Sequence, residues 1–164
     1  MKYLSTRNNK ISESFLNILF QGLSKDGGLF LPKKWPKISI GDIKTSTYQE
    51  IAYVVTKPYL ENEISNQQLI TIIDKAYKNF TNNNIAPLIS LNDNKYILEL
   101  FYGPTFAFKD YALQFLGNLF SAVLQNKKKQ ITVLGATSGD TGSAAINAFK
   151  GKNDIQVFIL HPYE

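Results

Sequence analysis

The stretch ITVLGATSGDTGSAAINAF, residues 131–149, decides the fold class. Its first five residues, Ile131 to Gly135, form a short apolar run that predicts a buried strand. A loop of glycine, serine and threonine follows, and the small apolar residues from Ala144 to Phe149 predict a helix. A strand that leads through such a loop into a helix is typical of α/β proteins.

The loop inside this stretch has the chemistry of an anion site. The first backbone N–H groups of a helix have no partner within the helix, and hydroxyl side chains add further donors. The glycine spacing is G-x-x-x-G-x-x-G, which differs from the dinucleotide-binding fingerprint, and no Walker A lysine follows. The spacing leaves two interpretations open: a ligand-binding loop, or a tight strand-to-helix turn capped by an aspartate or a threonine.

Further strands and helices alternate on both sides of this stretch. Residues 155–160 predict another strand after it, and residues 87–91 and 95–101 predict two strands well before it. A long amphipathic helix is expected between them, with these apolar residues at helical spacing: Leu113, Leu116, Leu119, Phe120, Val123 and Leu124. Alternating strands and helices predict βαβ units and a parallel sheet.

One lysine lies where the expected strand 95–101 meets this helix, in the segment LFYGPTFAFKD, residues 100–110. Lys109 follows a Gly-Pro turn and has aromatic neighbours. Apolar surroundings remove hydration from a lysine ammonium and favour the neutral amine, which is the nucleophile in covalent attachment to a carbonyl. The alternative is an ordinary surface lysine at a helix start. Phe106 and Phe108 either line a pocket or pack in the core.

The first part of the chain predicts a small, mainly helical region. Ser12 predicts the N-cap of one helix, and the capping box Ser65-x-x-Gln68 opens the most clearly amphipathic helix of the chain. The polar run Asn82-Asn83-Asn84 ends that helix. We therefore expect two parts, residues 1–84 and residues 85–164, of which the second begins an α/β domain.

Composition excludes several classes of function. The chain has no cysteine, which excludes a disulfide framework and a thiol nucleophile, and its single histidine, His161, excludes a multi-histidine metal site. The net charge of +5 raises nucleic acid as a partner, but the lysines are scattered and their one run, Lys127 to Lys129, is short. We expect no metal, no nucleic acid and no membrane association, and a cytoplasmic location. A lone histidine at a strand end, such as His161, is most often structural.

Five segments together resemble the threonine synthase family. They are YLSTRN (3–8), QGLSKDGGLFLP (21–32), APLISL (86–91), GPTFAFKDYALQ (103–114) and GATSGDTGSAA (135–145), in the order of that family. The last two segments are the most specific. The resemblance implies a pyridoxal-phosphate enzyme of fold type II, the tryptophan-synthase-like fold. It also implies an α/β chain whose small, mainly helical N-terminal region precedes the beginning of a parallel-sheet domain.

The resemblance implies a reaction and a set of site residues. The reaction converts O-phosphohomoserine and water to L-threonine and phosphate, by γ-elimination followed by β-addition of water. Lys109 is implied as the catalytic lysine that carries pyridoxal 5'-phosphate, and Asp140 as a second cofactor-binding residue near its phenolic oxygen. The implied ligands of the substrate carboxylate are Thr137, Ser138, Gly139 and Thr141. The implied partner is a small-molecule substrate, and the assembly is a monomer or a homodimer.

Members of this family are longer than 164 residues. The resemblance places their cofactor-phosphate loop and the partner of the pyridine nitrogen beyond residue 164, so we expect the N-terminal part of a threonine synthase. Two alternatives stay open: a non-catalytic truncated remnant, and another fold-type-II lyase such as a dehydratase or a cysteine synthase. The segments at 3–8 and 26–32 and the aspartate at 140 favour threonine synthase over such a lyase.

Overall fold

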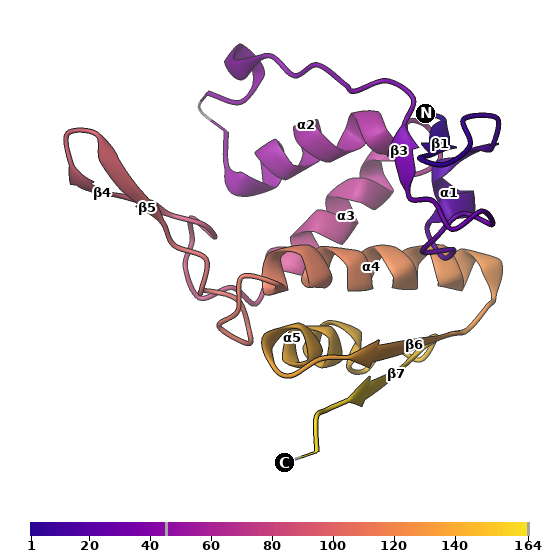
Figure 1. Cartoon of the computed structure of the whole chain (residues 1–164). Coiled ribbons are helices and arrows are strands. Elements are labelled where there is room, and N and C mark those ends of the chain that lie inside the picture. The colour runs from indigo at the N-terminus through magenta and orange to yellow at the C-terminus, as the bar shows by residue number, and fades with distance from the viewer. Residues whose placement is uncertain (45, 164) are drawn as a thin grey trace. The chain divides into compact units, whose positions relative to one another are not determined.

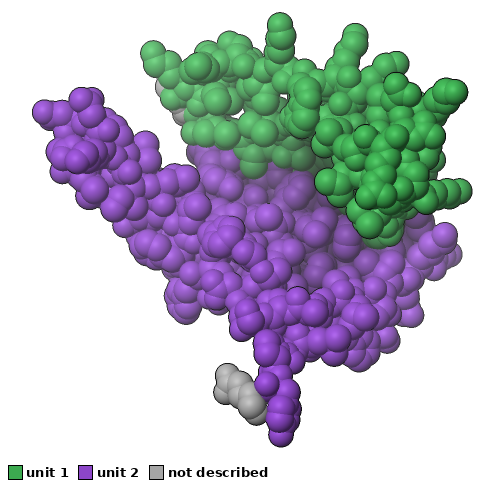
Figure 2. Space-filling view, viewed as in Figure 1, with its two compact units in different colours: residues 1–46, 50–69 green, residues 47–49, 70–164 purple. Residues whose placement is uncertain are grey.

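The computed structural model describes residues 1–44 and 46–163, which fall into two compact units (Figure 2). Unit 1 comprises residues 1–46 and 50–69, and unit 2 comprises residues 47–49 and 70–164. The expected boundary after residue 84 stays a prediction. Within the described residues, no helix combines the length and the apolar character needed to cross a bilayer.

Unit 1 is built on a three-stranded antiparallel sheet with the order β2-β1-β3. The strands are β1 (Tyr3–Ser5), β2 (Ser12–Glu13) and β3 (Phe30–Pro32), and the helix that follows β2 is α1 (Phe15–Ile18). The expected N-cap at Ser12 is wrong, because Ser12 pairs with Leu4 in the sheet and Ser14 holds the N-cap position of α1. This antiparallel pairing delays the helix and leaves it only one turn long.

The rest of unit 1 secures this sheet through a few specific contacts. It contains the short 3-10 helix η1 (Ile40–Asp42), most of α2 (Tyr48–Leu60) and the start of α3 (Asn66–Tyr77). The Glu63 carboxylate accepts hydrogen bonds from the two amides that open α1, at 2.9 and 3.1 Å. The Tyr3 hydroxyl donates to the carbonyl of Tyr59 at 2.7 Å, and burial raises the pKa of Tyr3 to about 12. The expected cap of α3 is confirmed, since the Gln68 amide donates to the Ser65 hydroxyl at 3.2 Å.

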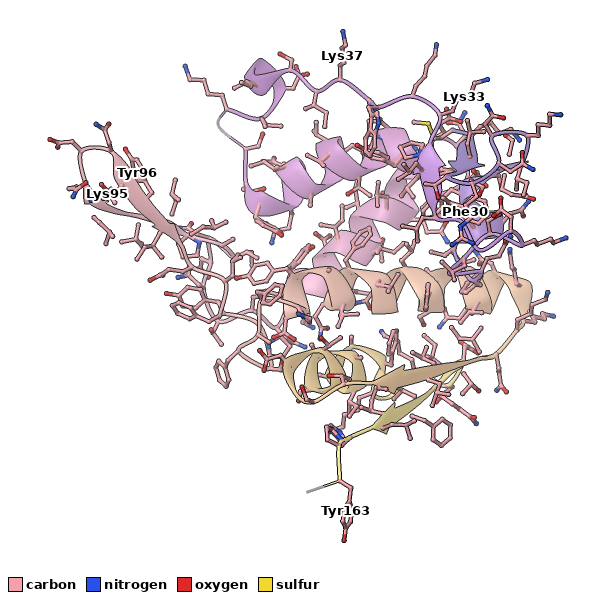
Figure 3. All side chains as sticks on the ribbon, viewed as in Figure 1. Phe30, Lys33, Lys37, Lys95, Tyr96 and Tyr163 are labelled. Atoms are coloured by element: carbon pink, nitrogen blue, oxygen red, sulfur yellow. The ribbon has the colours of Figure 1, made fainter. Side chains whose placement is uncertain are left out.

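Unit 2 contains an antiparallel hairpin and a helix–strand–helix–strand succession (Figure 1). The hairpin consists of β4 (Leu88–Asn92) and β5 (Lys95–Leu98), whose residues are all exposed; Lys95 and Tyr96 are labelled near its tip in Figure 3. The succession is α4 (Asp110–Lys127), β6 (Ile131–Ala136), α5 (Asp140–Phe149) and β7 (Ile155–Leu160). Strands β6 and β7 pair in parallel from Ile131 opposite Ile155 to Ala136 opposite Leu160, which confirms the expected α/β class.

Helices α4 and α5 approach each other closely through small residues. A Cβ atom added at Gly117 would lie 2.6 Å from the carbonyl oxygen of Ala148, so only glycine fits there without displacing the backbone. On either side of this contact, the Gln114 amide donates to the Asn147 side chain at 2.8 Å, and the Phe120 and Phe149 rings stack with centroids 6.1 Å apart. The contact between α4 and α5 therefore depends on glycine at position 117.

We predict that Gly117→Ala lowers the free energy of unfolding by about 1–3 kcal/mol, because the added methyl group forces the two helices apart. Urea denaturation of the chain measures this loss. Gly41→Ala is the matched control, since its added Cβ meets only the Ser39 hydroxyl, at 3.4 Å. Equal urea midpoints for Gly117→Ala and the unaltered chain would contradict the prediction.

Candidate functional site

Lys109 holds the N-cap position of α4 and follows a tight turn that begins at Gly103. The Phe106 amide donates to the Gly103 carbonyl at 3.1 Å, and Phe106 adopts a left-handed backbone conformation with φ of 59°. The Lys109 side chain is half-buried, and its Nζ lies 3.9 Å from the centroid of the Phe108 ring. Phe106 and Phe108 are 74% and 57% exposed, so neither ring packs in the core of unit 2.

The residue after the lysine fixes this turn. Asp110 is fully buried, and its carboxylate accepts hydrogen bonds from the backbone amide of Thr105 at 2.8 Å and from the Thr105 hydroxyl at 2.7 Å. A side chain at Gly103 would overlap the Asp110 side chain. The sequence pattern alone did not indicate this role of Asp110. A sequence signal for this role of Asp110 is an aspartate in the first turn of a helix with a threonine five residues earlier.

The first turn of α4 contributes one ring, Tyr111, to a cluster of four aromatic side chains. Tyr48, Tyr77, Phe80 and Tyr111 form edge-to-face contacts with centroids 4.8 to 6.3 Å apart. The Tyr111 hydroxyl donates to the carbonyl of Ile85 at 2.7 Å, and the Tyr77 hydroxyl donates to the carbonyl of Tyr111 at 3.1 Å. Burial raises the pKa of both tyrosines, so both stay protonated and able to donate near neutral pH. The residues that follow Lys109 are therefore held both by the Asp110–Thr105 hydrogen bonds and by this aromatic cluster.

The glycine-rich loop follows β6 directly. The Thr137 amide donates to the carbonyl of Leu160 at 3.0 Å, and the Thr137 hydroxyl accepts from the Gly139 amide at 3.2 Å. Gly139 holds the N-cap position of α5 and contributes no capping side chain, while Asp140 is the first residue of the helix and is exposed. Ser138 and Thr141 are exposed as well. Asp140 is therefore not the cap of α5, and the threonine that accepts a backbone amide in this turn is Thr137.

An open cavity of about 340 Å³ lies at the carboxyl ends of the two parallel strands. Thr137 and Ser138 line it after β6, and His161 lines it after β7. Ligands of open α/β sheets bind in this position, beyond the carboxyl ends of the strands. The sequence predicts a structural role for His161, and this stays a prediction. Its position directly after a strand parallel to β6 is the signal that places it beside the loop.

The lysine and the loop lie at the same end of unit 2. The contacts between α4 and α5 advance in the same direction along both helices, from Gln114 with Asn147 to Phe120 with Phe149, so both helices run in the same sense. Lys109 precedes Gln114 by five residues and Asp140 precedes Asn147 by seven, which is between one and two helical turns in each case. Figure 1 shows the start of α4 and the loop before α5 at one end of the unit. Lys109 is not among the described residues that line the cavity.

The sequence of the chain is similar to one family model and to several known proteins. The family model described as "Threonine synthase N terminus" matches residues 2–77. The threonine synthase of Schizosaccharomyces pombe is 46% identical over 99% of this chain and 34% of its own length, and that of Pseudomonas aeruginosa is 40% identical over 99% and 35%. The chain therefore spans about a third of the length of these relatives.

Two solved structures resemble the chain over almost its whole length. A structure of threonine synthase from Brucella melitensis with bound PLP has a TM-score of 0.93 and 40% identity, and covers 99% of this chain and 36% of that one. The structure of yeast threonine synthase has a TM-score of 0.92 and 43% identity, and covers 98% and 35%. Each of these two structural similarities covers residues of both unit 1 and unit 2.

We predict that Asp110→Ala lowers the free energy of unfolding by about 3 kcal/mol, because it removes two hydrogen bonds to a buried charged acceptor and leaves their donors unpaired. Thr105→Val removes only the hydroxyl bond and costs about 1 kcal/mol. Asp74→Ala, at an exposed position of α3, is the control for loss of a helical aspartate. Urea denaturation ranks the three variants, and equal stability of Asp110→Ala and Asp74→Ala would contradict the assignment.

Proposed function

The chain belongs to the threonine synthase family, and we propose that it supplies the lysine-bearing part of a site that converts O-phosphohomoserine and water to L-threonine and phosphate. The observation that carries this proposal is the placement of Lys109 and of the loop 137–141 at one end of unit 2. The proposal includes the type II fold of pyridoxal-phosphate enzymes and a cytoplasmic location. The PLP-bound structure from Brucella melitensis supports the cofactor assignment.

The residues around Lys109 fit pyridoxal phosphate. The Lys109 amine is only half-buried, so an aldehyde can reach it, and the exposed rings of Phe106 and Phe108 offer apolar surface to an aromatic ring. When bound, the cofactor supplies the electron sink for the reaction. We propose that the Lys109 Nζ holds the cofactor and, when it is not bonded to it, moves protons to and from the substrate carbon atoms.

The loop after β6 fits the carboxylate of the substrate. The start of α5 carries roughly half a positive charge, which favours an anion at the amides that open the helix. Ser138 and Thr141 add exposed hydroxyl groups there, and Gly139 leaves the approach free of a side chain. We propose that these residues and Thr137 bind the substrate α-carboxylate, with Asp140 beside the phenolic oxygen of the cofactor.

We predict that Lys109→Ala strongly lowers turnover in a hybrid enzyme, in which this chain replaces the matched third of the yeast threonine synthase. The loss of the amine removes both the attachment point and the proton carrier, so phosphate release from O-phosphohomoserine should fall by about 10²- to 10⁴-fold. Borohydride reduction of the unaltered hybrid followed by peptide mapping should place the cofactor on Lys109.

The control for this experiment is Lys150→Ala, which removes an exposed lysine at the end of α5 and should leave turnover unchanged. A cofactor label on another lysine of the chain, or a Lys109→Ala hybrid as active as the Lys150→Ala hybrid, would overturn the assignment.

We predict that Asp140→Asn separates a role at the cofactor from a role in stability. Because the Asp140 carboxylate is exposed and does not occupy the N-cap position, the melting temperature should change by the equivalent of less than about 1 kcal/mol. The absorbance of the bound cofactor should shift and the turnover of the hybrid should fall. Asp93→Asn, in the exposed hairpin turn, controls for the lost charge. Unchanged absorbance and turnover would leave Asp140 without a function at the cofactor.

A further inference from the structure

The parallel pair of strands β6 and β7 is covered on one face and open on the other. Exposure alternates along both strands, so that every second residue is exposed. Ile159 belongs to the covered face, because a Cβ atom added at Gly142 of α5 would lie 3.0 Å from its Cγ2 atom. The opposite face, which we call the outer face, consists of six exposed residues: Thr132, Leu134, Ala136, Gln156, Phe158 and Leu160.

The outer face is apolar where the two strands pair. Leu134 is 69% exposed, Phe158 opposite it in the register is 56% exposed, and Leu160 is 60% exposed. Parallel sheets of α/β proteins are normally covered on both faces. In the part of the chain that the structure describes, this sheet has only two strands, so each strand also has an edge without a neighbouring strand. The residues of unit 2 therefore leave this sheet incomplete.

The hairpin β4–β5 is apolar on both of its faces. Leu88 pairs with Leu98 on one face and Ile89 pairs with Ile97 on the other, and all four side chains are exposed. An isolated two-stranded hairpin is only marginally stable in water, and contiguous exposed apolar residues mark surfaces that bind another polypeptide. The hairpin is therefore a second, independent indication that unit 2 is suited to a polypeptide that packs against it.

The length of the relatives indicates which polypeptide this is. The chain matches only 34–36% of the threonine synthases compared with it, so about two thirds of each relative lie outside the match. The TM-score of 0.93 to the PLP-bound structure shows that the chain shares the backbone conformation of the same third of a whole enzyme. A surface that already has its bound conformation binds without a cost of rearrangement.

We propose that the outer face binds the remaining two thirds of a threonine synthase, and that this binding needs no peptide bond between the two parts. The proposal rests on membership of the family and on the open apolar face. It does not rest on the reaction assigned to Lys109, because the binding of the two parts requires no substrate and no turnover.

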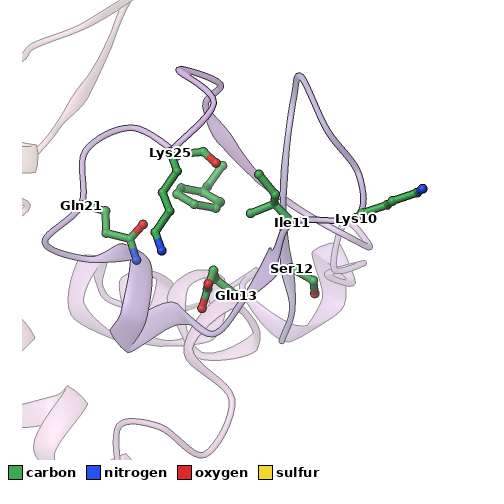
Figure 4. Close-up of a pocket in the computed structure, with 8 residues that line it drawn as sticks. Lys10, Ile11, Ser12, Glu13, Gln21 and Lys25 are labelled. Carbon is green, nitrogen blue, oxygen red and sulfur yellow. The ribbon is translucent and has the colours of Figure 1, made fainter.

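Coexpression of two separate polypeptides tests this proposal. The chain is produced together with an affinity-tagged polypeptide that comprises yeast threonine synthase beyond its matched third, and the two should copurify in equal amounts. Phe158→Lys should lower the recovery of the chain about tenfold, as expected for a charge placed in an apolar interface. Gln21→Lys is the control, since it adds the same charge at an exposed polar position in the open hollow of unit 1 (Figure 4).

Thiol labelling tests where the two polypeptides meet. The chain has no cysteine, so Leu134→Cys introduces a single thiol into this polypeptide. Its labelling should be at least about tenfold slower in the complex than in the free chain, because a covered thiol reacts only when the contact opens. Ile40→Cys, at a position of unit 1 that is 79% exposed, is the control and should be labelled at equal rates in both.

The single-chain hybrid enzyme joins the same two parts and shows whether they are compatible. The proposal is overturned if the hybrid does not unfold cooperatively, or if it does and the separate polypeptides fail to copurify. Equal labelling of Leu134→Cys in the complex and in the free chain also overturns it, as does a dimer of the free chain that protects this thiol equally. A complex that forms but has no turnover would contradict the proposed function and leave this proposal supported.

Discussion

The buried carboxylate of Asp110 is the constraint on which the presentation of Lys109 depends. A carboxyl group removed from water needs hydrogen-bond partners, and Thr105 supplies two donors, its backbone amide and its hydroxyl. This pairing closes the turn between β5 and α4, and Gly103 is the residue that leaves room for it. Asp110 is buried, and the hydroxyl of the half-buried Tyr111 donates to the carbonyl of Ile85. The side chain of Lys109, which precedes both residues, stays partly accessible at the start of the helix.

A second constraint relates this turn to the glycine-rich loop. The close contact of Gly117 with the backbone at Ala148 fixes α5 against α4, and both helices begin at the same end of unit 2. The parallel register of β6 and β7 then places the residues after each strand together, which joins Thr137 and His161 in one cavity. Lys109 and the loop after β6 are thus positioned by the packing of Gly117 against Ala148 and by the pairing of β6 with β7.

The sequence predicted the elements whose signals are local. The sequence predicts the helix α4 from its apolar period, the strand, loop and helix of residues 131–149, and the strand β7. It also predicts that Lys109 lies at the start of a helix. The failures have non-local causes. Ser12 has the residue type of an N-cap, but antiparallel pairing with Leu4 places it in a strand. Asp110 was missed because its role is set by Thr105, and the position of His161 beside the loop depends on the register of β6 with β7; local patterns encode neither.

The segment around Lys109 departs from the rules that stability alone would favour. Phe106 combines a left-handed backbone conformation with a side chain that is 74% exposed, and Phe108 is exposed beside it. The left-handed conformation costs a bulky residue roughly 1–2 kcal/mol, and exposed rings forgo the gain from burial. Such departures are expected where the chain serves a ligand instead of its own core. The hydrogen bonds between Asp110 and Thr105 stabilise this turn. The turn can therefore carry two exposed aromatic rings and an accessible amine on its surface.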